Sequence, residues 1–298
     1  MAPISAGGGR EKQSAALTSL LAAVGLTALK IAVAVASGSL GILAEVAHSG
    51  LDLVGTLMTY LAVRVSGRPP DRTHPYGHGK IESLSALAEC LVLLATCAWV
   101  VREAVLRLVT RSVEIEVTWW AFAVMLVSIA VEASRAHALK RVAKKFTSPA
   151  LEADALHFQS HIWSTAVVIL GLTAVKIGQW WPSLAFLRNG DPLAALGVSG
   201  LVAWVTVRLG RSTVDALLDS APAGMEDRIA AIVAALPGIH NCHNIRIRYS
   251  GPVLFIDLHV LVDGRQTLAE AHSLTETIET AIQGIAPGAD VTVHPEPF

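Results

Sequence analysis

The sequence predicts a membrane protein built as an all-α six-helix bundle followed by a small α+β domain of αββαβ order. Three observations support this fold class. The 298-residue chain is 53% hydrophobic and 16% charged, with a mean hydropathy of +0.53, whereas soluble domains are about 25% charged. Its first two thirds contain six apolar stretches long enough to cross a bilayer, which takes about 20 residues. Beyond residue 222 the pattern changes to short alternating and amphipathic segments.

The six stretches predict membrane-spanning helices separated by connections of different character. The tripeptide at 37–39 suits a tight turn, residues 66–80 are rich in Pro, Gly and His, and residues 135–145 are basic. Residues 1–13 are polar and Gly-rich, so we expect a disordered tail and no signal peptide. The predicted helices occupy residues 15–36, 40–65, 81–108, 117–139, 149–178 and 191–214.

The predicted domains are a tail at 1–13, a transmembrane domain at 14–215 and a cytoplasmic domain at 216–298. In the last domain we expect one helical layer on one sheet. Its predicted elements are a helix at 225–236, strands at 244–249 and 253–262, a helix at 267–282 and a strand at 290–294.

Charge predicts the orientation and excludes one class of partner. Lys and Arg gather at the ends of the predicted helices that share a side with the N-terminus, which indicates that both termini are cytoplasmic. A net charge of -1 gives no indication of a nucleic-acid partner. The three cysteines lack CxxC spacing and imply no disulfide framework. The expected location is a bacterial cytoplasmic (inner) membrane, crossed several times.

Two strings of similar pattern, residues 44–52 (AEVAHSGLD) and 153–161 (ADALHFQSH), lie in apolar stretches. Each places two potential ligands four residues apart, on one face of a helix. Counting about 1.5 Å per residue from the helix ends, His48 and Asp52 reach depths that overlap those of His157 and His161. We therefore expect these four side chains to meet near the middle of the membrane, where ionisable groups indicate function. The alternative is a set of buried histidines hydrogen-bonded to neighbouring helices.

Three imidazoles and one carboxylate suit tetrahedral Zn²⁺. Related divalent ions, such as Co²⁺, Ni²⁺, Cd²⁺ and Fe²⁺, are also expected to bind. Histidine binds metal only when neutral, and its reference pKa is about 6.5. Metal binding therefore displaces H⁺, which makes a metal–proton exchange chemically reasonable.

Two acidic residues flank this predicted site. Glu45 precedes His48 by almost one turn, and Asp154 precedes His157 by the same interval. They are predicted to attract the ion on the exit and entry sides, respectively. The alternative is that both acids lie at the ends of their helices, at the membrane interface, and do not interact with the ion.

Three segments resemble the cation diffusion facilitator family. They are residues 47–52 (AHSGLD), 74–84 (HPYGHGKIESL) and 153–157 (ADALH), and the αββαβ tail is similar to the family's cytoplasmic domain. The resemblance covers nearly the whole chain. It implies a homodimeric, proton-coupled exporter of divalent metal with six helices in each protomer, without naming the metal.

One position departs from the family pattern. The family's fifth helix usually ends this motif with Asp, where this chain has His161. Replacing a carboxylate with an imidazole lowers the expected affinity for Mn²⁺ or Mg²⁺ and favours Zn²⁺, Co²⁺ or Ni²⁺.

A second predicted site lies in the Pro-, Gly- and His-rich loop. Asp71, His74 and His78 are spaced three and four apart, and similar loops in the family carry a metal site. The alternative is a polar loop with incidental histidines. By resemblance, Lys80 would pair with Asp219 and lock the dimer where the two domains join, although alone it is also a typical positive-inside residue.

The tail is rich in histidine. The resemblance implies a binuclear site at its dimer interface formed by His243, His259, His272, His294 and Glu296. His240 and Cys242 are candidates for additional ligands, with surface or packing roles as the alternative. The alternative for the whole cluster is a solvated polar face.

The sequence gives no indication of an enzyme. It contains no HExxH, GxSxG or GxxxxGK[ST] motif, so metalloprotease and ATP-driven activities are not expected. Two non-enzymatic alternatives to exchange remain open, a passive divalent-cation channel and a metal-sensing membrane receptor.

Overall fold

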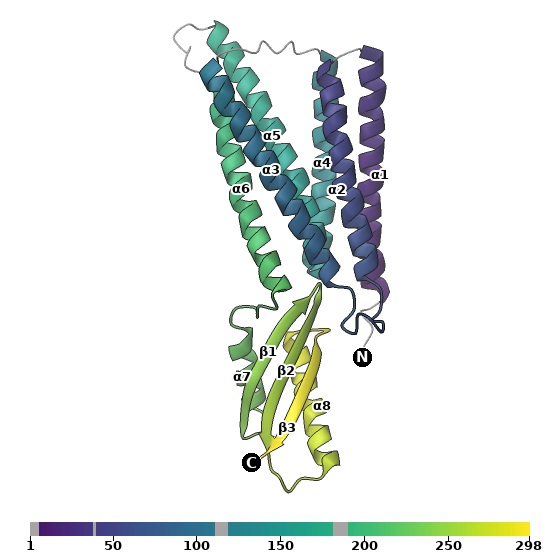
Figure 1. Cartoon of the computed structure of the whole chain (residues 1–298), viewed down its shortest axis with the longest axis vertical. Coiled ribbons are helices and arrows are strands. Elements are labelled where there is room, and N and C mark those ends of the chain that lie inside the picture. The colour runs from purple at the N-terminus through teal and green to yellow at the C-terminus, as the bar shows by residue number, and fades with distance from the viewer. Residues whose placement is uncertain (1–5, 38–39, 111–118, 181–189) are drawn as a thin grey trace.

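The computed structural model describes residues 6–37, 40–110, 119–180 and 190–298. Within the helices some side chains, including those of Glu45 and His48, lie outside this description. Six long helices run roughly along one axis, and a small domain lies beyond one end of them (Figure 1). The bundle consists of α1 (Ala6–Ser37), α2 (Leu40–Ser66), α3 (Lys80–Thr110), α4 (Trp119–Phe146), α5 (Pro149–Trp180) and α6 (Gly190–Leu217).

The helices measure 27 to 32 residues, which exceeds the length needed to cross a bilayer. Within the described residues, Gly8–Ala36 and Lys80–Leu106 each contain an 18-residue window apolar enough to qualify as a membrane span, with a mean hydropathy of 2.1. Near the middle of α4 lie Glu132 and Arg135, both of which are buried.

The first helix begins earlier than the sequence predicted. Residues 6–13 belong to α1, so the prediction of a disordered tail over 1–13 is wrong for that part. The reason is a buried polar cluster. Lys12 Nζ lies 2.6 Å from Glu82 Oε1, with side-chain exposures of 5% and 0%. Ser66 and Ser148 donate to the same Glu82 carboxylate, so the cluster joins the first, second and third helices to the start of the fifth.

The turn between α4 and α5 sets the position of the fifth helix. Thr147 has a left-handed backbone (φ 47°), and the Ser148 N–H donates to the Ala143 carbonyl at 3.1 Å. Pro149 then occupies the first helical position, where its missing N–H costs nothing. From this turn α5 packs against α2, α3, α4 and α6, which makes it the central helix of the bundle.

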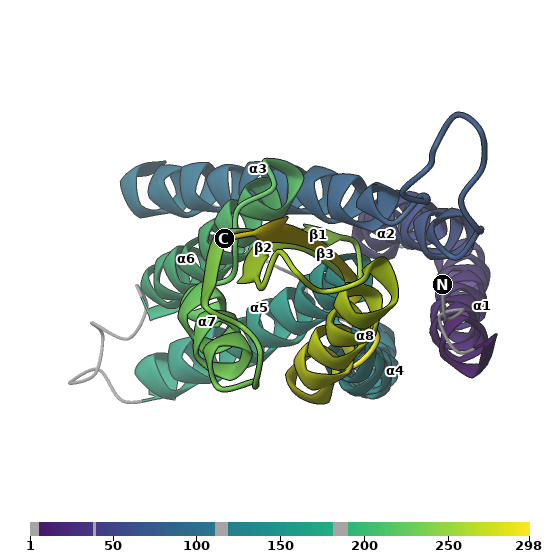
Figure 2. The same ribbon diagram turned by 90° about the horizontal axis from the view of Figure 1, so that it is seen from below.

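The C-terminal domain has the predicted αββαβ order. It consists of α7 (Met225–Ala234), β1 (Asn241–Ser250), β2 (Val253–Val262), α8 (Leu268–Ile285) and β3 (Asp290–Pro297). The central β2 pairs antiparallel with β1 and parallel with β3. Both helices cover one face of the sheet (Figure 2). Alternate β2 residues, including Ile256 and Leu258, are buried against Ile229, Ile278 and Ile282, and the intervening residues, such as Asp257 and His259, lie on the opposite face.

Both outer strands are longer than predicted. The register of β1 shifts between His243 and Arg246, where Asn244 has a φ of 52°, and such a bulge interrupts the alternation that signals a strand. The last strand extends through Pro295 to Pro297. Proline is tolerated there because this is an edge strand.

The two domains meet at a close backbone contact. Gly79, just before α3, lies so near Ser250 and Gly251 of the β1–β2 turn that an added Cβ at Gly79 would collide with the Ser250 carbonyl. Gly251 also has a φ of +60°, a conformation that favours glycine. The loop before the third helix is therefore fixed against the C-terminal domain.

Candidate metal centre

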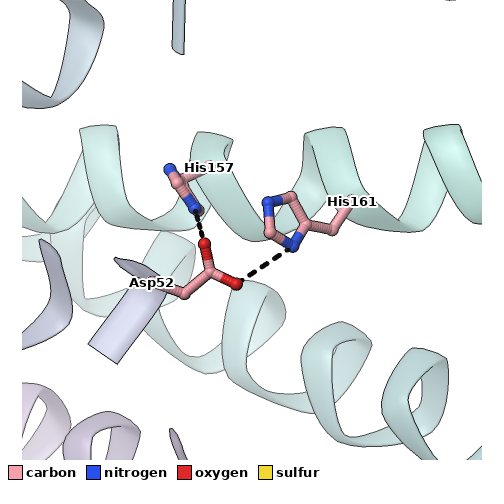
Figure 3. A group of neighbouring side chains, drawn as sticks. All are labelled: Asp52, His157 and His161. Carbon is pink, nitrogen blue, oxygen red and sulfur yellow. Dashed lines mark hydrogen bonds and ion pairs between the residues drawn. The ribbon is translucent and has the colours of Figure 1, made fainter. Parts of the chain in front are cut away.

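The second and fifth helices bring three of the predicted ligands together inside the bundle. Asp52 projects from α2 towards His157 and His161, which lie one turn apart on α5 (Figure 3). The Asp52 Oδ1 atom is 3.1 Å from His157 Nε2, and Asp52 Oδ2 is 3.8 Å from His161 Nδ1. One ligand atom from each residue lies within 4.8 Å of the other two.

This group is shielded from solvent. The side-chain exposures are 14% for Asp52, 8% for His157 and 14% for His161. The remaining predicted ligand, His48, lies on α2 one turn before Asp52, but its side chain is outside the described residues. Its participation stays a prediction.

Of the two predicted flanking acids, the structure describes the side chain of Asp154 only. The Glu45 side chain lies outside the described residues. Asp154 is 1% exposed and interacts electrostatically with Arg135 of α4. Asp154 is therefore charge-compensated within the bundle, and its predicted role in attracting the ion stays a prediction.

Sequence reasoning missed two carboxylates beside this group. Glu89 of α3 places Oε1 3.8 Å from His157 Nδ1, and its other oxygen accepts a hydrogen bond from Thr59 at 3.1 Å. Glu132 of α4 places Oε1 3.8 Å from His161 Nδ1. Both are buried. A signal was available in the sequence, because each is an isolated acid within an apolar helix.

Sequence reasoning also missed the internal role of Arg135, which was counted only among the basic residues near the cytoplasmic end. Its guanidinium donates to Ser19 Oγ at 3.0 and 3.1 Å and to Thr56 Oγ1 at 3.3 Å. It also lies 3.7 Å from the centre of the Phe158 ring. Arg135 thus links α4 to α1, α2 and α5 on the side of the candidate centre that is nearer the C-terminal domain.

The loop residues predicted as a second site also come together. Asp71 Oδ1 lies 3.2 Å from His74 Nδ1, and Asp71 Oδ2 lies 3.4 Å from His78 Nε2. Hydrogen bonds from the Thr73 hydroxyl and from the backbone N–H groups of His74 and Thr73 hold the pKa of Asp71 well below its usual range. The carboxylate is therefore available as an anionic ligand at neutral pH.

This loop group is attached to the C-terminal domain. The Tyr76 ring packs edge-on against Phe255 with centroids 5.5 Å apart, and the Arg248 guanidinium lies 4.2 Å from the Tyr76 ring centre. The predicted contact between Lys80 and Asp219 is present, with Nζ 2.8 Å from Oδ1. Asp219 also faces Arg248 at 3.8 Å. Whether this contact locks a dimer stays a prediction.

In the C-terminal domain, His243, His259 and Glu296 form a third group on the uncovered face of the sheet. Glu296 lies 2.7 Å from His259 Nδ1 and 3.3 Å from His243 Nε2. The pKa of Glu296 is lowered, first by the hydrogen bond from His259 and then by the three neighbouring imidazoles. His294 lies at the edge of the group, 3.9 Å from Glu296.

The other predicted residues of this domain do not join the group within one protomer. His272 projects from α8, is 72% exposed and faces Glu276 at 3.7 Å. The His240 ring lies against the Phe298 ring at a tilt of 45°, with centroids 3.7 Å apart. Burial raises the pKa of the Cys242 thiol, which disfavours the thiolate that would bind metal.

All three groups offer imidazole nitrogens and carboxylate oxygens, the donors that suit Zn²⁺ and related ions. They differ in access: the side chains of Asp52, His157 and His161 are 8% to 14% exposed, whereas those of the loop and sheet groups are more exposed, apart from His78.

Comparisons with known proteins match both parts of the chain. Residues 16–218 match the family model described as the cation efflux transmembrane domain, and residues 221–298 match the cation efflux protein cytoplasmic domain. The chain is 33% identical over 296 residues to the cation-efflux pump FieF of Cronobacter sakazakii, covering 97% of this chain and 94% of that protein. A protein of the same name from Klebsiella pneumoniae is 32% identical over 290 residues, with the same coverage. Among solved structures, the metal-bound C-terminal domain of the CzcD transporter from Thermotoga maritima is 38% identical and covers 24% of this chain and 86% of that chain, with a TM-score of 0.24.

Proposed function

The chain belongs to the cation diffusion facilitator family, and on that premise we propose that it exports divalent transition-metal cations in exchange for protons. The intramembrane group of Asp52, His157 and His161, completed by His48, is the transport site. The site binds one cation and opens alternately to the two sides of a bacterial inner membrane. Both termini face the cytoplasm.

One observation carries this proposal. Asp52 lies between two imidazoles from another helix, at 3.1 and 3.8 Å, in a buried part of the bundle. Keeping ionisable groups in such a place is costly, and their presence indicates an ion pathway. Because the ligands come from different helices, relative movement of α2 and α5 would weaken the site and release the cation.

The donor set favours Zn²⁺ as the substrate. Three imidazoles and one carboxylate match the tetrahedral preference of Zn²⁺, and Co²⁺, Ni²⁺, Cd²⁺ and Fe²⁺ are alternative substrates. Protons are the proposed counter-ion because a protonated imidazole cannot bind metal. Each cation that enters must displace the protons bound to the site, and each proton that returns lowers the affinity for the cation.

The remaining groups have supporting roles in the proposal. Asp71, His74 and His78 receive metal at the cytoplasmic mouth of the bundle. His243, His259, His272, His294 and Glu296 bind metal at the interface of a homodimer. The contact between Lys80 and Asp219 then transmits the state of the C-terminal domains to the third and sixth helices.

The proposal is tested with purified protein in sealed vesicles carrying an imposed pH gradient. Zn²⁺, Co²⁺, Ni²⁺, Fe²⁺ and Mn²⁺ are compared as substrates. We expect Zn²⁺ flux that ends when the gradient is collapsed and that is lost in Asp52→Ala, while Asp257→Ala, on the exposed sheet face, retains it. Flux that continues without a gradient would instead identify a passive channel. The absence of metal flux from the wild type would identify a receptor.

A further inference from the structure

Glu132 lies on the fourth helix beside the candidate transport site, and it belongs to neither of the two motifs, residues 44–52 and 153–161, that predicted this site. Its Oε1 atom lies 3.8 Å from His161 Nδ1, and its side chain is 8% exposed. The same His161 nitrogen lies 3.8 Å from Asp52 Oδ2. One imidazole nitrogen therefore faces two carboxylates, from α2 and from α4.

The distances suit donors that share one ion. Two donor atoms bound to the same tetrahedral Zn²⁺ at about 2.0 to 2.2 Å are about 3.3 to 3.6 Å apart. The contact of Asp52 with His157 is 3.1 Å, and the contacts of His161 with Asp52 and with Glu132 are both 3.8 Å. Asp52, His157 and His161 each offer a donor atom within 4.8 Å of the other two, and Glu132 reaches this group through its contact with His161.

Charge provides a second argument. With neutral imidazoles, Asp52 is the one carboxylate among the three described ligands, so one positive charge of a bound dication stays unbalanced within this ligand set. A buried charge without compensation is costly. A carboxylate ligand from Glu132 would balance this charge at the ion itself, whereas Glu89 lies on the far nitrogen of His157.

Glu89 differs from Glu132 in the nitrogen that it faces. It lies 3.8 Å from Nδ1 of His157, whereas Asp52 lies on the Nε2 side of the same ring. His157 Nδ1 is buried and makes no hydrogen bond within the described part of the chain. A carboxylate on the far nitrogen of a metal-binding histidine orients the ring without touching the ion. Glu89 thus has the position of an orienting group, and Glu132 has that of a ligand.

We propose that Glu132 is a further metal ligand of the transport site, so that α2, α4 and α5 together hold the cation. This inference rests on the proposed function of the same site. The competing explanation is that Glu132 only balances the charge of Arg135, with which it interacts electrostatically.

The test uses Co²⁺ as a spectroscopic probe of the full-length protein. Each variant is titrated with Co²⁺, and the visible absorption of Asp52→Ala at the same Co²⁺ concentration is subtracted. The difference is the absorption of Co²⁺ at the intramembrane site. We expect Glu132→Gln to weaken Co²⁺ binding at this site by at least about tenfold and to change the shape of the absorption band. The matched control is Glu152→Gln, an exposed acid in the first turn of α5, which should bind as the wild type does.

A further variant separates a ligand from a charge partner of Arg135. Glu132→Asp keeps the charge but shortens the side chain, so a ligand loses affinity and a charge partner does not.

The inference is overturned if either Glu132→Gln or Glu132→Asp binds Co²⁺ as the wild type does, including the case in which only the thermal stability of the variant falls. In that case the proposed function stands, because the wild-type signal still depends on Asp52. If the wild type itself gives no signal that depends on Asp52, the proposed transport site is wrong, and this inference is wrong with it.

Discussion

The balance of imidazole and carboxylate at the candidate site determines which metals it accepts. Asp52, His157 and His161 meet at distances of 3.1 and 3.8 Å. Imidazole is a good donor for Zn²⁺ and its neighbours, whereas carboxylates suit harder ions such as Mn²⁺. His161 is therefore the residue at which the selectivity of this chain should be easiest to change.

We predict that His161→Asp shifts the preference from Zn²⁺ towards Mn²⁺. The ratio of the two dissociation constants should change on the order of tenfold, equivalent to about 1.4 kcal/mol. Competition between Zn²⁺ and Mn²⁺ for the metal bound by the full-length protein but not by its Asp52→Ala variant measures this ratio. The control is His137→Asp on the exposed side of α4. An unchanged ratio in His161→Asp would mean that this side chain does not bind the ion.

Much of the site followed from the sequence because ligands four residues apart on a helix share a face. That rule predicted the pairs His48/Asp52 and His157/His161, and the similar depths of these pairs predicted that the helices bring them together. Glu89 and Glu132 escaped prediction because neither has a second metal-binding residue three or four positions away on its helix. Their relation to the site depends on how α3 and α4 pack against α5, which local patterns do not encode.

At the scale of elements, buried polar contacts hold the ends of the helices nearest the C-terminal domain. The Glu82 carboxylate contacts Lys12, Ser66 and Ser148. The prediction of a disordered first segment failed here, because the sequence around Lys12 is polar and its partner lies seventy residues away. A polar stretch can be ordered when one of its charges pairs with a buried opposite charge on another helix.

We predict that Lys12→Ala destabilises the protein by about 3 to 5 kcal/mol, since it leaves the buried Glu82 carboxylate without its cation. Chemical unfolding in detergent measures the loss. The control is Lys145→Ala, which breaks an exposed pair with Glu11 at 2.6 Å and should cost less than about 1 kcal/mol. Equal losses in the two variants would contradict the importance of the buried cluster.

The start of α8 provides a test of pH dependence. Thr267 and Glu270 form a capping box, and hydrogen bonds from the backbone and hydroxyl of Thr267 lower the pKa of Glu270. A lowered pKa in the folded state stabilises the helix above the ordinary carboxyl pKa of about 4.3. This stabilisation is lost as the pH falls through the lower, folded pKa.

We therefore predict that Glu270→Gln speeds amide hydrogen exchange in the first turn of α8 at neutral pH. The difference from the wild type should disappear on acidification through the folded pKa of Glu270. Glu279→Gln, further along the same helix, should leave the first turn unchanged. A difference between Glu270→Gln and the wild type that persists at low pH would show that the charge of Glu270 is not its cause.

At the scale of the whole molecule, the two domains are joined at a small set of contacts. Lys80, at the start of the third helix, meets Asp219 just beyond the sixth, and Arg248 of the sheet approaches the same carboxylate. Sequence reasoning reached the pair of Lys80 and Asp219 only through the family resemblance. The packing of Tyr76 on Phe255 and of Gly79 on Ser250 was not predictable, because it depends on how the domains dock.

We predict that Asp219→Asn loosens this junction without unfolding either domain. Asn tolerates the left-handed backbone of residue 219 (φ 59°), so the variant removes mainly the charge. The pair is 38% and 41% exposed, and its loss should cost at most about 1 kcal/mol. Amide hydrogen exchange at residues 79–82 and 249–251 should speed up, while Asp215→Asn serves as the control. Unchanged exchange would contradict a role for this pair in joining the domains.

The most direct measurement is a structure of the full-length protein with bound Zn²⁺, with the metal located by its anomalous scattering. We predict Zn²⁺ between α2 and α5, with Asp52, His157 and His161 each about 2.0 to 2.2 Å from the ion. Zn²⁺ confined to the loop and to the C-terminal sheet, with nothing bound between these helices at saturating metal, would contradict the account.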